Sequence, residues 1–339
     1  MSIKLERIEP TDLDNYVAKY HPEANFLQTS SWGKVYELDG EKVLYFGLYK
    51  SGDLRGTAVV IVKNAKRGRY LEIPGGPILD WDHEPDCVHE FMDEIRKVAE
   101  QEDCVFVRMR PNIPDSFEHK KMIEDLGLVP SPMHLHAEHT VMIDLRRSEE
   151  DLLKEMRRQT RYEVRRAEKL GIQVSFDTSK HAFNEFYDMQ LETAKRQNFI
   201  PSTRNFIMAQ HDAFAGAARI YTATLDGRPL AKGLVIMQNP EAIYHEAAST
   251  EESRKLPGAY ALQWRVIRDA RDLGFKRYNL FGIAPPNSPN HRYAGVTTFK
   301  TGFGGEQIAY LPAHDLIIRP FRYKFVHMLE EARKKRRHL

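Results

Sequence analysis

One lysine of this sequence lies among aromatic and glycine residues, and it has the clearest chemical use. The segment 299–306 reads FKTGFGGE and contains Phe299 and Lys300 together with three glycines. This composition predicts a tight loop, too irregular for ordinary secondary structure. Its order of glycine and lysine differs from that of a Walker loop, so it is not a nucleotide-binding P-loop. In acyl transfer, a cationic side chain of this kind can stabilise the oxyanion that develops on the reacting carbonyl.

No enzyme nucleophile accompanies this lysine. The sequence has no Gly-x-Ser-x-Gly elbow, and neither Cys87 nor Cys104 has metal-binding or redox spacing. We expect both cysteines to be structural thiols in a reducing compartment. For an acyl transfer, direct attack by a substrate amine therefore fits better than a covalent enzyme intermediate.

Two clusters in the first half of the chain can also carry chemistry. Residues 26–34 read FLQTSSWGK, and the small polar residues before Trp32 predict a capped helix with Trp32 in the core and Lys34 in solvent. Residues 74–77 read PGGP and include Gly76 and Pro77. Two glycines between prolines make a loop of fixed shape. That loop either admits the close approach of a ligand or simply ends a strand, and the residues favour neither.

Two more clusters lie in the second half. Residues 193–199 read TAKRQNF at the end of a predicted helix. There Arg196 can bind a carboxylate or phosphate, or can serve only the helix dipole. Residues 244–249 read YHEAAS in a predicted strand, and alternation places Tyr244 and Glu246 on one face. Such a polar face indicates either a site or an exposed sheet surface.

A basic segment precedes the second half. Residues 149–170 predict one long amphipathic helix ended by Gly171, with Lys154, Arg158, Arg161 and Arg165 on a shared face. A phosphate-binding face is one interpretation, and a solvated face paired with glutamates is the favoured one.

Three histidines lie between the two halves. His134 and His136 can share a face and, with His139, suggest a metal site. No acidic or cysteine ligand completes the set, so we favour a polar linker strand.

The order of predicted elements repeats along the chain. The first half has strands at 43–49, 54–62, 69–73 and 105–109, with a helix at 85–101. The second half has a helix at 180–197, strands at 220–225, 230–237, 242–248 and 278–282, and a helix at 259–273, and the chain closes on a helix with a basic tail. Because hairpins dominate, we predict an α+β (mixed α/β) fold with mostly antiparallel sheets and a join near residues 130–148.

Composition excludes several classes of protein. The 339 residues are 42% hydrophobic and 29% charged, with a net charge of +2, so a chain-wide nucleic-acid binder is excluded and any RNA contact is expected to be local. The N-terminus lacks the apolar region of a signal peptide, and no apolar run reaches the length of a membrane span. We therefore expect a cytoplasmic protein.

In their order along the chain, these motifs resemble the Fem (FemABX) family, the aminoacyltransferases that build peptidoglycan interpeptide bridges. The resemblance runs from Phe26 to about Asp315. It rests on FLQ at 26–28 with Trp32, Gly76-Pro77, RY at 161–162 with RRAEKLG at 165–171, Thr193 with Arg196 and Phe199, YALQW at 260–264, YNLFGI at 278–283, and FK at 299–300 with GFGG at 302–305. The chain is similar to the compact members, since it has no heptad run long enough for a coiled-coil arm.

The resemblance implies a fold and a reaction. It implies two tandem GNAT-like (acyl-CoA N-acyltransferase-like) domains, with boundaries expected at 1–142 and 143–314. A C-terminal segment with a basic tail, 315–339, is expected to pack back on the first domain. The implied donor is an aminoacyl-tRNA. The implied acceptor is the stem-peptide amine of a peptidoglycan precursor, either UDP-MurNAc-pentapeptide or a lipid II-type molecule. No cofactor or metal is expected, nor is an oligomer, while a peripheral membrane contact remains open.

The resemblance also assigns residues. Lys300 matches the lysine that stabilises the tetrahedral oxyanion, with Phe299 beside it. Lys34 and Arg196 match positions that hold the precursor's phosphates, and Tyr244 lines the same groove. The Gly76-Pro77 turn contacts the precursor in the family, although Gly75 stands where many members have arginine.

Two other functions stay open. One is an N-acyltransferase of the same fold that uses acyl-CoA or another activated donor, although KLPGAY at 255–260 lacks the full pyrophosphate-binding pattern of acyl-CoA enzymes. The other is a non-catalytic protein that binds the precursor or tRNA.

Overall fold

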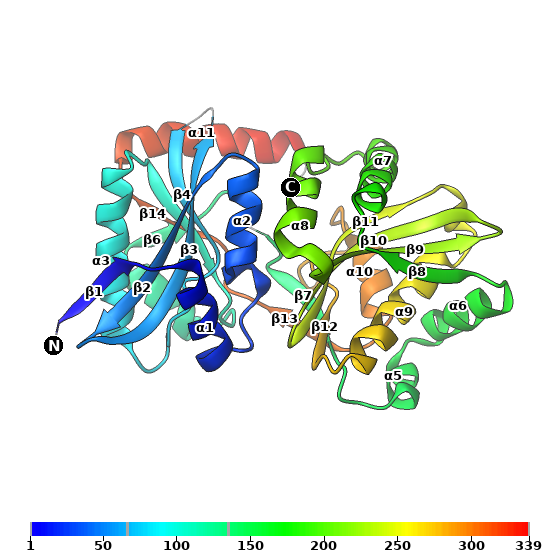
Figure 1. The fold of residues 1–339 in the computed structure, drawn as a ribbon. Helices are drawn as coiled ribbons and strands as arrows, with labels where there is room; N and C mark the ends of the chain where they lie inside the picture. The colour runs from blue at the N-terminus through cyan, green and yellow to red at the C-terminus, as the bar shows by residue number, and fades with distance from the viewer. Residues whose placement is uncertain (1, 66–67, 134–135, 338–339) are drawn as a thin grey trace. The chain divides into compact units, whose positions relative to one another are not determined.

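The computed structural model describes residues 2–65, 68–133 and 136–337, with side chains as far as Glu331 (Figure 1). The chain forms two compact units, of which unit 1 comprises residues 1–138 and 309–339 and unit 2 comprises residues 139–308. Each unit is built on a seven-stranded sheet and has its own hydrophobic core.

Unit 1 carries its strands in the order β1-β2-β3-β4-β5-β14-β6. All neighbours pair antiparallel except β4 and β5, which are parallel. Its elements are β1 (Ile3–Arg7), α1 (Pro10–Tyr20), η1 (Phe26–Gln28), α2 (Ser30–Leu38), β2 (Lys42–Lys50), β3 (Asp53–Ala65), β4 (Gly68–Gly75), α3 (Pro85–Gln101), β5 (Phe106–Pro111), α4 (Phe117–Asp125), β6 (Leu128–Pro130), β14 (His314–Ile317) and α11 (Pro320–Arg337).

The core of unit 1 shows why periodicity predicted its main helix so closely. Helix α3 repeats apolar residues every three or four positions, and the face that includes Val88, Phe91 and Ile95 is buried against the sheet. Pro85 opens the helix at a position where its missing N–H costs nothing. The amphipathic stripe therefore fixes the helix at Pro85–Gln101, the range that the sequence predicts.

Unit 2 carries its strands in the order β13-β7-β12-β11-β10-β9-β8, with β11 and β12 parallel. Its elements are β7 (His139–Asp144), α5 (Glu149–Glu155), α6 (Arg158–Lys169), β8 (Gln173–Asp177), α7 (Lys180–Gln197), α8 (Arg204–Phe214), η2 (Ala215–Ala217), β9 (Ala218–Leu225), β10 (Arg228–Gln238), β11 (Glu241–Ser249), η3 (Glu252–Arg254), α9 (Gly258–Asp272), β12 (Arg277–Asn279), α10 (Ala294–Thr301) and β13 (Glu306–Ala309).

The two sheets repeat one plan, which confirms the predicted pair of similar halves. Read from β1 and from β8, both run through a hairpin, a further strand and a parallel neighbour that follows a helix. Counted in the same way, the sixth strand of each sheet comes from one end of its unit's sequence. In unit 2 it is β7, which precedes all the other strands, and in unit 1 it is β14, which follows all the others. Each sheet is thus completed by a strand distant in sequence from its neighbours.

Three expected elements differ from the structure. The helix expected over 149–170 is two helices, α5 and α6, separated by extended backbone at Met156 and Arg157. The strand expected over 278–282 ends at Asn279. Residues 299–306, expected to be an irregular loop, include the last turn of α10, which contains both Phe299 and Lys300. In the described residues, no helix is long and apolar enough to span a bilayer.

Candidate active site in unit 2

Lys300 is buried in unit 2, although its side chain carries an ionisable amine. It lies in the last turn of α10 with 9% of its surface exposed. Its Nζ donates to the carbonyl oxygen of Gly282 at 2.8 Å and to that of Phe281 at 3.2 Å. An ammonium group has three N–H donors, so these two bonds leave a third N–H for a substrate oxygen.

The backbone after β12 is shaped so that these two carbonyls meet the lysine. Phe281 has a φ of +56°, a left-handed conformation that is rare for a bulky residue. Its N–H donates to the side-chain oxygen of Asn279 at 2.8 Å, and Thr297 of α10 accepts from the N–H of Ala284 at 2.8 Å. The turn is therefore fixed at both ends, and such strained backbone is commonly found at functional sites.

Asn279 is itself held by a buried network. Its Nδ2 donates to Glu241 Oε1 at 3.0 Å, and its Oδ1 accepts from Thr140 at 2.5 Å. Arg277 donates to the other oxygen of Glu241 at 2.6 Å. Burial raises the pKa of Glu241, while Arg277 and Asn279 oppose that shift. The network orients the amide that sets the turn presenting the carbonyls to Lys300.

Burial changes the acidity of Lys300. Loss of water around the ammonium lowers its pKa from the ordinary value of 10.5 to about 7. Protonated and neutral forms of this lysine are therefore both populated near neutral pH. Only the protonated form can offer a positive charge to a developing oxyanion.

Tyr244 of β11 lies beside the lysine. The Lys300 Nζ is 5.9 Å from the centre of the Tyr244 ring, within the range of a cation–π interaction. Gly233 makes room for this ring, because a Cβ at that position would lie 2.6 Å from Tyr244 Cε2. Burial raises the pKa of Tyr244 to about 12, so its hydroxyl stays protonated at neutral pH. The structure thus brings Lys300, Phe299 and Tyr244 together.

Phe299 belongs to an aromatic cluster that anchors α10. Its ring lies 5.0 Å from that of Tyr260 and 5.3 Å from that of Phe303, both edge-on. Edge-to-face pairs of this kind stabilise the packing of the rings. Phe299 therefore positions the helix that carries Lys300.

The break between α5 and α6 also positions α10. The backbone N–H of Arg157 donates to Gly302 O at 2.8 Å, and its guanidinium donates to Thr298 O at 2.7 Å. Arg161 donates to the carbonyls of Leu153, Lys154 and Met156 at 2.9–3.1 Å. Arg161 thus satisfies the orphan carbonyls at the end of α5 and stabilises the break between α5 and α6.

Arg161 is half-buried and its Nη1 is engaged by these carbonyls, whereas Lys154, Arg158 and Arg165 are exposed on the same segment. The shared face predicted for these four residues exists in part. Arg158, Arg161 and Arg165 lie on α6 at spacings of three and four residues, whereas the break at Met156 and Arg157 separates Lys154 on α5 from them. The positioning role of Arg157 was not identified from the sequence. The available signal was its position just before the family motif, which begins at Arg161.

Arg196 lies at the far end of β11. Its Nη2 donates to Ser249 O at 2.5 Å and to Ser249 Oγ at 3.3 Å. Thr193, one turn earlier on α7, donates to the same carbonyl at 2.9 Å and accepts from the Ser249 N–H at 3.0 Å. Ser249, the residue that Arg196 contacts, is five residues along β11 from Tyr244, which is roughly 16 Å of extended chain. In this structure its guanidinium secures the end of β11.

In unit 1, two of the singled-out motifs meet each other. Gln28 is fully buried; its Nε2 donates to Pro74 O at 2.8 Å and its Oε1 accepts from Val59 N at 2.9 Å. A Cβ on Gly76 would lie 2.4 Å from Gln28 Cδ. Gly76 and Pro77 are buried, so the close approach that Gly76 allows is that of the Gln28 side chain.

Lys34 of α2 is exposed and pairs with Glu37 at 3.1 Å. Thr29 caps this helix by accepting from the Trp32 N–H at 3.3 Å, and Trp32 is buried in the core as expected. Lys34 belongs to unit 1, whereas Lys300, Arg196 and Tyr244 belong to unit 2. That all four line one groove stays a prediction.

His134 lies outside the described residues, and His136 packs edge-on against Trp32 at 5.9 Å. Within the described part of the chain, no group of three His, Cys, Asp or Glu residues is arranged to bind a metal ion. Among the described residues, the histidine run therefore forms no metal site.

Fold and site together define the class of this protein. The chain has the architecture of tandem GNAT proteins: one such protein, from the clavulanic acid biosynthesis pathway, superposes with a TM-score of 0.58 at 12% identity, covering 94% of this chain and 99% of that one. The crystal structure of FemX superposes with a TM-score of 0.83 at 16% identity, covering 96% of this chain and 100% of that one.

The sequence comparison is more specific than the fold. The chain matches the FemAB family over residues 8–124, 132–228 and 226–331. It is 22% identical over 340 residues to the aminoacyltransferase FemA of Staphylococcus epidermidis, covering 75% of this chain and 81% of that one. This protein belongs to the FemAB family.

Proposed function

We propose that this chain is an aminoacyltransferase that moves an amino acid from aminoacyl-tRNA to the stem-peptide amine of a peptidoglycan precursor. Membership of the FemAB family and the named activity of its FemA relative support the transferase class. The observation that carries the proposal is the buried Lys300, which has a third N–H to offer and needs no enzyme nucleophile beside it.

The reaction is an aminolysis of an ester. The acceptor amine attacks the carbonyl carbon that joins the amino acid to the tRNA ribose, which forms a C–N bond and a tetrahedral oxyanion. Lys300 donates its third N–H to that oxyanion. The C–O bond to the ribose then breaks, and the ribose oxygen leaves with the proton lost by the amine. Removing such a donor typically costs about a hundredfold or more in rate.

The remaining site residues have proposed binding roles. Lys34 is exposed and pairs only at the surface with Glu37, so a precursor phosphate can replace that glutamate at little cost. Arg196 already donates to Ser249, and its guanidinium has five N–H donors, so it can bind a phosphate without leaving β11. We place Tyr244 on the wall of the same groove. Gly76 lies against Gln28, so we propose that Gly76 and Pro77 mainly shape the turn and contact the precursor in addition.

The test offers the purified chain a mixture of charged tRNAs with UDP-MurNAc-pentapeptide or with its lipid-linked form. We expect the peptide mass to increase by one amino-acid residue, and we expect Lys300→Met to lose that product while it still binds the precursor. A protein that forms no product with either acceptor, but acylates an amine from acyl-CoA, would replace this proposal with the acyl-CoA alternative. Binding without transfer from any donor would support the non-catalytic alternative.

We propose that the reaction takes place in the cytoplasm and that a monomer carries it out.

A further inference from the structure

We propose that helix α11 docks unit 1 onto an anionic membrane surface, with Phe321, Phe325 and Met328 inserted at the lipid interface. The inference deepens the proposed function and rests on it for its purpose, because a lipid-linked acceptor would be met at a membrane. The observations that carry it concern α11 and its contacts with the rest of unit 1.

The inner face of α11 is fixed to the sheet. Tyr323 and Val326 pack against Val105 and Phe106. The Tyr323 hydroxyl donates to Asp315 Oδ2 at 2.9 Å, and Glu330 accepts from Arg108 Nη2 at 2.8 Å. These buried contacts set the rotation of the helix about its own axis, so its opposite face is held outward.

That outward face is apolar. Phe321 is 90% exposed, and Phe325 and Met328 are each 58% exposed. Their spacing of four and then three residues puts them on one stripe of the helix, whereas Tyr323 and Val326 lie on the other side. A single exposed phenylalanine needs no explanation, but a stripe of three large side chains marks an interaction surface.

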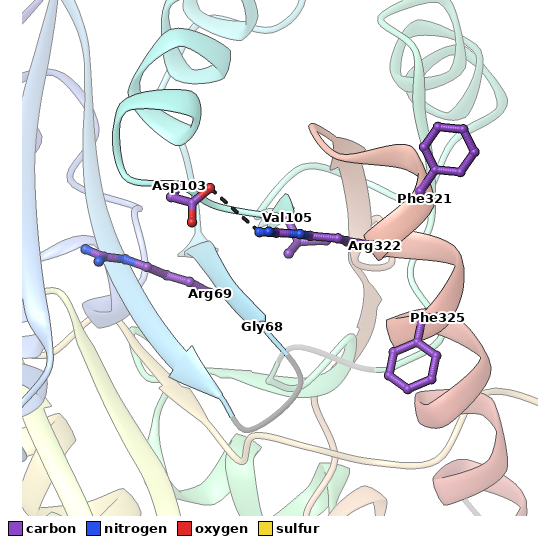
Figure 2. Close-up of a pocket in the computed structure, with 7 residues that line it drawn as sticks. All are labelled: Gly68, Arg69, Asp103, Val105, Phe321, Arg322 and Phe325. Atoms are coloured by element: carbon purple, nitrogen blue, oxygen red, sulfur yellow. Dashed lines mark ion pairs between the residues drawn. The ribbon is translucent and has the colours of Figure 1, made fainter.

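A recess adjoins the stripe. It has a volume of about 540 Å³. It is lined by Phe321, Arg322 and Phe325 of α11 and, on the sheet side, by Gly68, Arg69, Asp103 and Val105 (Figure 2). Figure 2 shows both phenylalanines projecting from successive turns of α11. The recess contains none of the predicted active-site residues. Phe321, Phe325 and Val105 give the recess an apolar part, and Arg69 and Arg322 place cationic groups beside that part.

The sequence that carries the stripe is strongly basic. Residues 319–337 contain eight Lys and Arg residues against two glutamates, and one of these, Glu330, is bound to Arg108. Arg319 and Arg322 lie 3.9 and 3.8 Å from Asp103, at the limit of an ion pair. A helix with aromatic side chains on one face and many cations beside them is typical of binding at the surface of an anionic bilayer.

RNA phosphates would pair with the cations, but they would leave the apolar stripe exposed to water. Phosphate contacts need lysine and arginine, and Met328 gains nothing from them. A bilayer interface takes up both features together, because acyl chains cover the apolar side chains while anionic headgroups bind the cations.

The test measures partitioning of the full chain onto vesicles by co-sedimentation, without substrates. We expect binding to vesicles that contain phosphatidylglycerol, weaker binding to pure phosphatidylcholine, and loss of the difference at high salt. Replacing Phe321, Phe325 and Met328 together by serine is expected to lower the partition coefficient about tenfold or more. Phe117→Ser is the matched control, since Phe117 is 77% exposed on α4 of the same unit, and it is expected to change nothing.

Equal partitioning of wild type and the triple variant would overturn the proposal. A triple variant that loses tRNA binding but keeps vesicle binding would also overturn it, because the helix would then bind RNA. So would a wild-type dimer that forms without lipid and that the triple substitution converts to a monomer. The triple variant is also expected to keep wild-type transfer to the soluble UDP-linked acceptor. Loss of vesicle binding with transfer intact therefore separates this inference from the proposed function.

Discussion

The Lys300 ammonium lies 2.8 Å from the carbonyl oxygen of Gly282, although the two residues are eighteen positions apart. The bond joins the last turn of α10 to the turn that follows β12. Backbone carbonyls do not neutralise a buried cation as a carboxylate would. The lysine is thus held in a defined position at a cost to stability, which is the arrangement expected of a group retained for its chemistry.

The first prediction concerns that cost. Burial lowers the pKa of Lys300 from 10.5 to about 7, so between these pH values the unfolded chain binds a proton that the folded chain does not. The free energy of unfolding therefore rises with pH across that window. Below about pH 7, burial of the charged lysine lowers the free energy of unfolding by its full amount. We expect Lys300→Met to gain stability relative to wild type by about 1–3 kcal/mol at pH 6, and to have lost part of that advantage by pH 9, within the window that ends at pH 10.5.

Denaturant unfolding at the two pH values measures this difference. Lys34→Met is the control: Lys34 is exposed on α2, and its substitution should give a small change that is the same at both pH values. An advantage for Lys300→Met that does not vary with pH would show that the lysine is not desolvated as described.

The second prediction separates structure from substrate binding at Gly76. A Cβ there would meet the Gln28 amide at 2.4–2.7 Å, so Gly76→Ala is expected to lower the free energy of unfolding by about 1–3 kcal/mol. Gly127→Ala is a poor control because its φ is positive; Gly216→Ala is the better one, with open space around it. If Gly76→Ala unfolds like wild type but weakens precursor binding, the turn serves the substrate directly.

The third prediction tests the helix break. Arg161→Ala removes the donor to three carbonyls at the end of α5 and should cost about 1–3 kcal/mol of stability. The neighbouring Arg158 is exposed, and Arg158→Ala should change stability by less than about 0.5 kcal/mol. Thermal unfolding of the two variants decides the point. Equal losses would contradict the capping role, and a larger loss of tRNA binding in Arg158→Ala would return that residue to the phosphate-binding interpretation.

Local patterns predicted the regular elements well. Helices α3 and α7 have the expected bounds because their apolar spacing is set by the residues themselves. Both hairpins were predicted from turn residues such as Asp226-Gly227, where the positive φ values of 51° and 75° occur. These features depend on neighbours in sequence, so the sequence alone is sufficient to predict them.

The active-site region was predicted less well, because its structure depends on partners far along the chain. Residues 294–301 read AGVTTFKT, which has little helical preference, and α10 is formed by packing on Tyr260 and by bonds from Arg157. The left-handed Phe281 could not be predicted from a strand-like YNLFG pattern. Lys300 and Tyr244 were named as site residues through family resemblance, and their proximity in unit 2 is a structural finding.

The central claim is that protonated Lys300 stabilises the oxyanion, and the pH dependence of kcat/KM for aminoacyl transfer tests it most directly. The acceptor amine, with an ordinary pKa of about 10.4, must lose a proton, so its reactive form increases tenfold per pH unit. Protonated Lys300 decreases by the same factor above its pKa of about 7. The account predicts a rise with slope one below about pH 7 and a plateau above it. In Lys300→Arg, which keeps its charge, the rise should continue past pH 7. A wild-type profile that rises more steeply than slope one below pH 7 and keeps rising above it would make Lys300 a base, and would contradict the account.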